Sequence, residues 1–217
     1  MLRRWFSGKP DPSPPPPVEG LAGDRFPRHS GAWAELRKRI ESGPALCIVD
    51  TGYTSPANIN YLTGLGHSVY LADPVADACT EDWRAGSDPD GHPVWNVEGF
   101  LDQSFPRERR TFDIALLWTA LDYLPEPFLA PLVARLYEVI HPDGQVLAFF
   151  HTRTQGDDMQ YYRYHLTAGD DVEMQRTRQF PLQRAFTNRS IERLFAGWAG
   201  QRQFLAKDSV SEVLIAR

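Results

Sequence analysis

The chain has 217 residues, 42% of them hydrophobic, and this is enough for one α/β domain with a complete core. Its net charge of −5 argues against a nucleic-acid partner, because such binding depends on neutralising phosphates with a basic surface. The absence of any run of about 18 apolar residues predicts no membrane span. The presence of only two cysteines fits a reducing, cytoplasmic setting.

Residues 1–28 are expected to form a disordered, proline-rich tail ahead of a folded domain at 29–217. The segment KPDPSPPPPVEG holds six of the 18 prolines, and such a composition favours an extended polyproline II conformation. Two interpretations of the tail are open. It is either a spacer or a docking site for a partner that binds proline-rich peptides.

The first half of the domain shows alternating helix and strand signals. Ser30 can cap a helix that stops at Gly43, and Pro56 fits the first turn of another helix. The apolar runs ALCIVD (45–50) and HSVYLADP (67–74) predict buried parallel strands. The pattern is weaker after them. There we expect a helix at about 74–83, a loop at 86–93, and a short third strand within PVWNVEGF.

The second half continues the pattern and then changes it. A strand is predicted in TFDIALLWTALDYL (111–124) with its carboxyl end near Trp118, followed by a helix at 126–140, a turn at 141–144 and a strand at 145–151. An insert near 157–183 has the alternating pattern of a hairpin. A helix at 187–198 and two closing antiparallel strands complete the chain.

This order predicts a Rossmann-like three-layer sandwich. Its centre is a mostly parallel seven-stranded sheet that ends in a C-terminal antiparallel hairpin. Open sheets of this kind bind ligands beyond the carboxyl ends of their strands, where the strand order reverses. The segments predicted to meet at that edge are Asp50 to Pro56, Asp73, Glu98 to Asp102, Trp118 to Asp122, and His151.

Four segments carry a resemblance to a known family: IVDTG running into a helix, HSVYLAD, FDIALLWTALDYL and HPDGQVLAFF. In order and spacing they resemble the class I S-adenosylmethionine-dependent methyltransferases over about residues 30–217. The resemblance implies S-adenosylmethionine as cofactor and the following cofactor-binding residues. Asp50 and Gly52 would lie beside its methionine part, Asp73 would bind the ribose, Glu98 or Asp102 would face the adenine, and Trp118 and Thr119 would lie near the transferable methyl.

The loop after the first strand departs from the family pattern. Thr54 and Pro56 stand where the family usually has two further glycines, and a β-branched residue tolerates a positive φ poorly. The helix N-terminus and the Asn58 amide could still hold a carboxylate. The loop is therefore either a cofactor loop of altered sequence or a turn that only connects a strand to a helix.

Methyl transfer requires aligned reactants more than a dedicated nucleophile, so the catalytic residues stay open. His151 and Asp122 are the candidate bases. Tyr161, Tyr162 and His165 could wall a substrate pocket, or could be the packed face of a hairpin or a dimer surface. The histidines show no metal-binding spacing, so no metal is expected.

The sequence therefore predicts a cytoplasmic methyltransferase that acts on a small molecule. The alternative is a non-catalytic, methyltransferase-like binding or scaffold protein. In that case the proline-rich tail and the tyrosine-rich insert would be contact surfaces for a protein partner. The sequence does not name the methyl acceptor or the oligomeric state.

Overall fold

The computed structural model describes residues 23–106, 111–154, 160–177, 180–205 and 208–217. Most of the expected proline-rich tail lies in residues 1–22, outside this set. The predicted end of the disordered tail at residue 28 is wrong, because β1 (Arg25–His29) already forms a strand. Within the described residues, no helix has the length and apolar character needed to cross a membrane.

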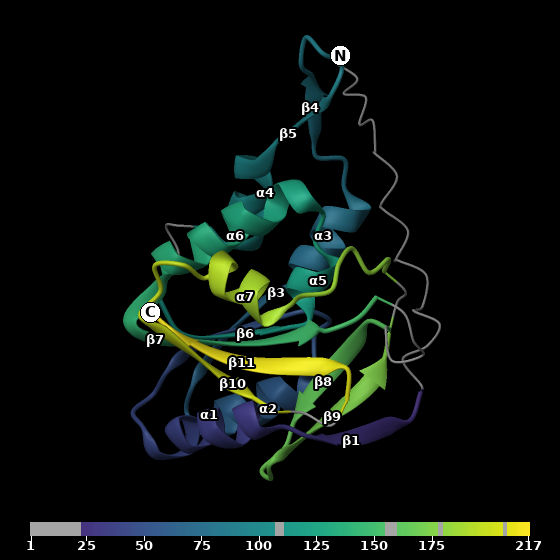
Figure 1. The fold of residues 1–217 in the computed structure, drawn as a ribbon. Coiled ribbons are helices and arrows are strands. Elements are labelled where there is room, and N and C mark those ends of the chain that lie inside the picture. The colour runs from purple at the N-terminus through teal and green to yellow at the C-terminus, as the bar shows by residue number, and fades with distance from the viewer. Residues whose placement is uncertain (1–22, 107–110, 155–159, 178–179, 206–207) are drawn as a thin grey trace, which may run out of the picture.

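The centre of the molecule is a mostly parallel α/β sheet, as predicted (Figure 1). It has six strands rather than the predicted seven. Four parallel strands form one side and the C-terminal antiparallel pair forms the other. In spatial order the strands are β10 (Gly200–Phe204), β11 (Val210–Ala216), β7 (Ile140–His151), β6 (Phe112–Trp118), β2 (Cys47–Thr51) and β3 (Ser68–Ala72).

The missing strand is the third one predicted. Its segment instead forms β5 (Pro93–Trp95), which pairs with β4 (Arg84–Ser87) in a hairpin that projects from the top of the view in Figure 1. Asn96 then accepts a hydrogen bond from the Gly99 N–H and caps α4 (Val97–Ser104). β3 is consequently the edge of the central sheet.

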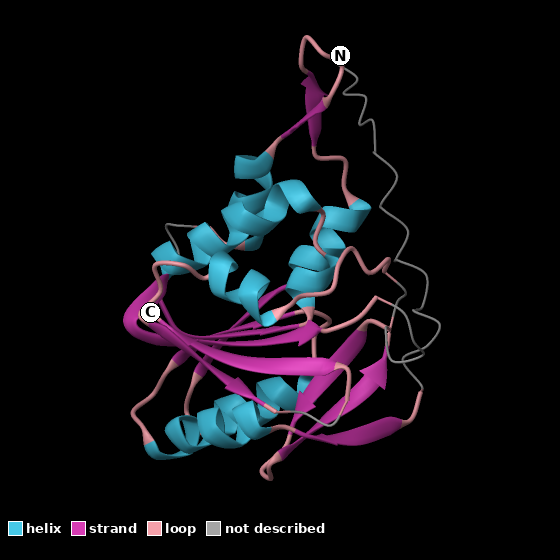
Figure 2. Cartoon of the chain, in the orientation of Figure 1, coloured by secondary structure: helices cyan, strands magenta, loops and turns pink. Residues whose placement is uncertain are grey.

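Helices cover both faces of the sheet (Figure 2). One face packs against α1 (Gly31–Ser42) and α2 (Pro56–Gly64). The Ser30 hydroxyl accepts a hydrogen bond from the Trp33 N–H, which confirms the predicted cap of α1. The other face packs against α3 (Pro74–Thr80), α4, α5 (Ala120–Tyr123), α6 (Glu126–Val139) and α7 (Asn188–Leu194).

The strand after α6 begins earlier than predicted. β7 starts at Ile140 and includes residues 141–144, which the sequence predicted as a turn. Its pairing with β6 is irregular there, because Phe112 pairs with Ile140 and Ile114 pairs with Gln145. The four residues are thus a local irregularity within a strand.

A second, three-stranded sheet lies beside the central one. The predicted insert hairpin is present as β8 (Tyr162–Leu166) and β9 (Asp171–Arg176), and β1 pairs antiparallel with β9. Side chains of this small sheet join the core on the α1 and α2 face. The hairpin therefore packs against the end of the central sheet instead of standing free.

Candidate functional site

The strand order reverses between β2 and β6. From β2 the chain passes first to β3 on one side and later to β6 on the other, so the crevice of a doubly wound sheet is expected at their carboxyl ends. Gly52 ends β2 with a φ of +116°, a conformation that suits glycine. Its N–H donates to the Ala72 carbonyl oxygen at 2.8 Å, which brings Gly52 beside Asp73.

The Asp50 carboxylate is buried under this turn. Its two oxygens accept hydrogen bonds from Trp118 Nε1 at 2.7 Å and from Asn58 Nδ2 at 2.8 Å. Burial raises the pKa of Asp50 to about 6, although both hydrogen bonds favour the ionised form. Asp50 thus lies where the sequence predicted, but its side chain binds other residues of the chain.

The Asn58 amide is also fully engaged. Nδ2 donates to Asp50 and to the Tyr164 carbonyl oxygen at 3.1 Å, and Oδ1 accepts from the Leu166 N–H at 2.7 Å. The first turn of α2 is capped by the Ser55 hydroxyl, which accepts from the Asn58 N–H. The Asn58 side chain, which was predicted to hold a carboxylate of the cofactor, binds the Asp50 carboxylate instead.

Trp118 lies at the end of β6, beside Asp50. With a φ of 48°, it is the only non-glycine residue with a positive φ in the described part of the chain. Its ring stacks on Tyr164, with centroids 4.8 Å apart and an angle of 7° between the planes. Thr119 follows it and is fully buried. Sequence reasoning placed both residues at this edge and missed the stack, because Tyr164 comes from the insert.

Tyr161 covers the turn from the side of the insert hairpin. Its hydroxyl oxygen lies 3.4 Å from the position that a Cβ on Gly52 would take. The ring is only 3% exposed and packs edge-on against Tyr123 and Phe180, at centroid distances of 4.9 and 5.1 Å. Tyr161 therefore fills the space above Gly52.

The loop follows a path that avoids the strain expected at Thr54. Thr54 is exposed, and its φ is not among the positive ones. The Ser55 hydroxyl that follows is hydrogen-bonded to His165 Nδ1 at 2.8 Å. The loop is thereby tied to β8.

Asp73 directly follows β3 and is only partly buried. Its Oδ1 accepts from the Ala76 N–H at 3.1 Å, which makes it the N-cap of α3. Asp73 thus caps α3 in this structure, one residue beyond the Ala72 carbonyl group that binds Gly52, and its ribose contact stays a prediction.

Glu98 and Asp102 lie elsewhere. Both are on α4, and their carboxylates form ion pairs with the Arg135 guanidinium of α6 at 3.0 Å each. Arg135 is buried, whereas the two acidic side chains are 67% and 65% exposed. Glu98 and Asp102 thus bind α6 and are not part of the cluster around Gly52. The reason is that the segment expected to be a strand is a helix.

Asp122 and His151 form a buried pair at the ends of α5 and β7. Asp122 Oδ2 lies 2.6 Å from His151 Nδ1 and accepts from the His151 backbone N–H at 2.7 Å. Burial raises the pKa of Asp122 to about 6, and the contact with His151 opposes the shift. The imidazole borders a cavity of about 40 Å³ that Tyr162 and Tyr164 also line.

The remaining candidates are interior residues. Tyr162 is 9% exposed and His165 is 1% exposed. His165 Nε2 lies 3.1 Å from the Gln175 side-chain oxygen, and burial lowers the pKa of the imidazole. Of the three residues predicted to wall a substrate pocket, Tyr161 lies over Gly52 and His165 binds Ser55 in the same loop.

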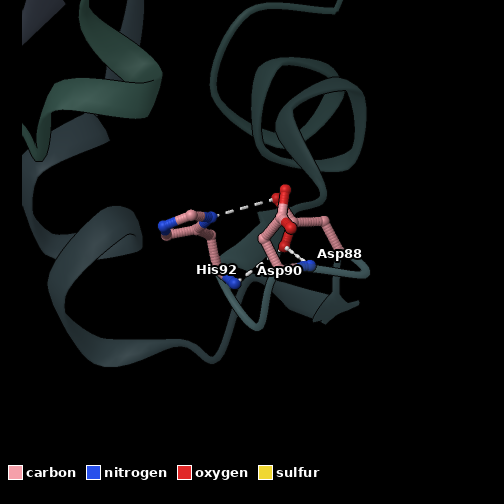
Figure 3. A group of neighbouring side chains, drawn as sticks. All are labelled: Asp88, Asp90 and His92. Atoms are coloured by element: carbon pink, nitrogen blue, oxygen red, sulfur yellow. Dashed lines mark hydrogen bonds and ion pairs between the residues drawn. The ribbon is translucent and has the colours of Figure 1, made fainter.

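One cluster that sequence analysis did not single out lies in the β4–β5 turn (Figure 3). Asp88, Asp90 and His92 have ligand-type atoms within 4.8 Å of one another. The Asp88 carboxylate accepts hydrogen bonds from the backbone N–H groups of Asp90 and His92, at 3.0 and 2.8 Å. These bonds shape a solvent-exposed turn, which accounts for the cluster without an ion.

The pKa of Asp50 leads to a testable pH dependence. We expect the wild type to lose on the order of 3 kcal/mol of unfolding free energy relative to Asp50→Asn between about pH 4 and pH 7. The unfolded carboxyl releases its proton near pH 3.9, and the folded one releases it near 6. The folded state therefore binds more protons in this window, and stability falls as pH rises. Urea unfolding of both proteins at several pH values measures the difference. A difference that does not change with pH would contradict the raised pKa.

Comparisons with known proteins give similarity of fold only. No family model and no curated protein matches the chain. Among solved structures, it is similar to a Burkholderia thailandensis 1,6-didemethyltoxoflavin-N1-methyltransferase with bound S-adenosylhomocysteine (13% identity, TM-score 0.43, 86% of this chain and 77% of the other). It is also similar to TehB from Haemophilus influenzae (13%, 0.47, 86% and 62%), of which it covers less than two thirds.

A third such structure is a TehB-like S-adenosylmethionine-dependent methyltransferase from Corynebacterium glutamicum (15% identity, TM-score 0.41, 86% of this chain and 87% of the other). At these identities the likeness does not assign an activity. The solved structures that this chain resembles thus include methyltransferases, and the resemblance is one of fold.

Proposed function

We propose that the chain is an S-adenosylmethionine-dependent methyltransferase that acts on a small molecule in the cytoplasm. One observation carries the proposal. Gly52, with its positive φ, and Asp73, at the end of the next strand, lie side by side at the point where the strand order reverses. This is where doubly wound sheets bind a nucleoside, with an acidic residue accepting from the ribose hydroxyls.

The residues around the crevice fit the two ends of such a cofactor differently. At the ribose end, Asp73 is partly buried, and the proposal places its carboxylate against the ribose hydroxyls. At the methionine end, Tyr161 occupies the space over Gly52. Binding there requires the Tyr161 ring to turn away, and the free energy of that movement weakens the affinity.

The protein itself has to contribute little to the chemistry of the reaction. When bound, the cofactor supplies a methyl group that is already activated. The chain then has to hold an acceptor in line, exclude water and remove a proton where the acceptor carries one. We assign the last task to His151, because Asp122 binds its Nδ1 and Nε2 would then be the nitrogen that accepts a proton. The chain's negative charge disfavours a nucleic-acid acceptor, and we propose a small molecule in its place.

Calorimetric titration with S-adenosylmethionine and S-adenosylhomocysteine tests the proposal through Asp73→Asn. Asparagine retains the capping oxygen of α3 and removes the charge, so we expect a folded variant that binds at least tenfold more weakly than the wild type. Asp90→Asn, in the exposed β4–β5 turn, is the matched control and should bind as the wild type does. Equal binding by wild type and Asp73→Asn would refute the assigned ribose contact.

A second candidate is a non-catalytic, methyltransferase-like binding protein. It is favoured by the hydrogen bonds that the Asp50 and Asn58 side chains make. Both Asp50 oxygens accept hydrogen bonds within the chain, Asn58 Nδ2 donates to two partners and Asn58 Oδ1 accepts from a third. If neither ligand binds even after Tyr161 is replaced, this second function is supported.

A further inference from the structure

β3 is the outermost strand on one side of the central sheet, and it is uncharged and partly exposed. Among the described residues, β3 has a neighbour only on its β2 side. Its sequence, SVYLA, contains no charge and no proline. Leu71 is 38% exposed, and the nearby Leu65 at the end of α2 is 42% exposed. Natural proteins rarely leave such an edge open, because it promotes pairing with other chains.

The opposite edge of the sheet is built differently. β10, with the sequence GQRQF, carries Arg202 in its centre between two glutamines. The Arg202 guanidinium lies 3.4 Å from the Glu35 carboxylate of α1, so an adjacent helix borders this edge. A charged strand is a common protection against edge-to-edge pairing. The contrast singles out β3 as the edge suited to a partner strand.

The register shows which backbone groups of β3 face outward. The Ser68 N–H donates to Leu46 in the direction of β2, and the Ala72 carbonyl oxygen accepts from Gly52 on the same side. Backbone groups alternate along a strand, so those of Tyr70 also face β2. The N–H and C=O groups of Val69 and Leu71 therefore face away from the sheet.

We propose that two copies of the chain associate through antiparallel pairing of their β3 strands. A two-fold axis at Tyr70 places Val69 of one copy opposite Leu71 of the other, and each such pair exchanges two hydrogen bonds. All four outward groups of both strands are then satisfied, and the two sheets become one. The uncharged strand brings no like charges together at the axis.

A second copy fits this edge because the strand is its own complement. The outward donors and acceptors are symmetric about Tyr70, so an identical strand in antiparallel orientation matches them without a shift in register. The exposed Leu65 and Leu71 lie on or beside the same edge and supply apolar surface to the contact. β3 has only five residues, so the pairing between the two copies extends over no more than five residues of each.

Light scattering coupled to gel filtration tests the proposal on the full chain. We expect a mass of twice 24.6 kDa at high protein concentration. Leu71→Lys places two positive charges near the axis and should give a folded monomer of 24.6 kDa. Leu205→Lys, which changes a fully exposed leucine just after β10, is the matched control and should remain dimeric. A wild type that is monomeric at every concentration overturns the proposal, as does a dimer lost only in Leu205→Lys.

Hydrogen exchange gives a readout that does not depend on a substitution. The Val69 and Leu71 amides should gain protection as protein concentration rises, whereas the Tyr70 amide, bonded to β2, should be protected throughout. Fast exchange of the Val69 and Leu71 amides at every concentration would overturn the proposed pairing. Neither experiment involves S-adenosylmethionine, so the outcome is independent of the proposed methyltransferase activity.

Discussion

Replacing Tyr161 with alanine is expected to tighten the binding of S-adenosylmethionine about a hundredfold. In the wild type, the ligand must displace a ring that is 3% exposed and packs against Tyr123 and Phe180. Removing a buried aromatic side chain from its surroundings costs about 3–5 kcal/mol, and about 3 kcal/mol corresponds to a factor of a hundred in affinity. In Tyr161→Ala the ring is absent, so the ligand does not have to displace it and this cost no longer weakens binding. Calorimetric titration of both proteins measures the ratio.

Tyr162→Ala is the matched control for this experiment. Tyr162 is adjacent in sequence and similarly buried. It packs in a different part of the core, against Phe26 and Tyr164. Its loss should destabilise the fold by a similar amount and leave the affinity unchanged. Circular dichroism establishes that both variants are folded. Equal tightening in the two variants would show general loosening of the structure, and no binding by either would favour the non-catalytic candidate.

The parallel sheet could be predicted because its signals are local. Each of the segments ALCIVD, HSVYLAD and FDIALLW is a short apolar run next to a helix signal, and all three became adjacent strands. The third predicted strand failed for a physical reason. PVWNVEGF is divided by Asn96, whose side chain caps a helix, so its first half pairs in a hairpin and its second half is helical.

The sequence predicted which residues lie at the carboxyl ends of the strands, and it did not predict what their side chains contact. Asp50, Gly52 and Asp73 follow apolar runs, and the carboxyl ends of parallel strands meet at one edge, so their proximity follows from the pattern. Tyr161 and Tyr164 reach the same place from an insert about 110 residues later in the chain. No periodicity links an insert to a loop at that separation, and the filling of the crevice could be learned only from the structure.

Replacing Glu212 with alanine should lower the free energy of unfolding by about 4 kcal/mol. Glu212 on β11 is 1% exposed and forms a buried ion pair with Arg28 of β1. Its other oxygen accepts from the Ser30 hydroxyl at 3.0 Å and the Ala32 N–H at 2.9 Å. Removing one partner of a buried ion pair costs about 3–5 kcal/mol, and here the Ser30 and Ala32 donors lose their acceptor as well. Urea unfolding measures the loss.

The Arg25–Glu173 pair supplies the control, because it joins β1 to β9 in contact with solvent. The two side chains are 46% and 38% exposed, so Glu173→Ala should cost less than about 1 kcal/mol. A small loss in Glu212→Ala would instead mean that Asp208, 2.7 Å from Arg28 Nε, compensates the Arg28 charge alone. Sequence analysis assigned Arg28 to a disordered tail, since nothing local marks it as buried. The large expected effect follows from its position in the structure, where β1 and the start of α1 are attached to the last strand of the chain through Glu212.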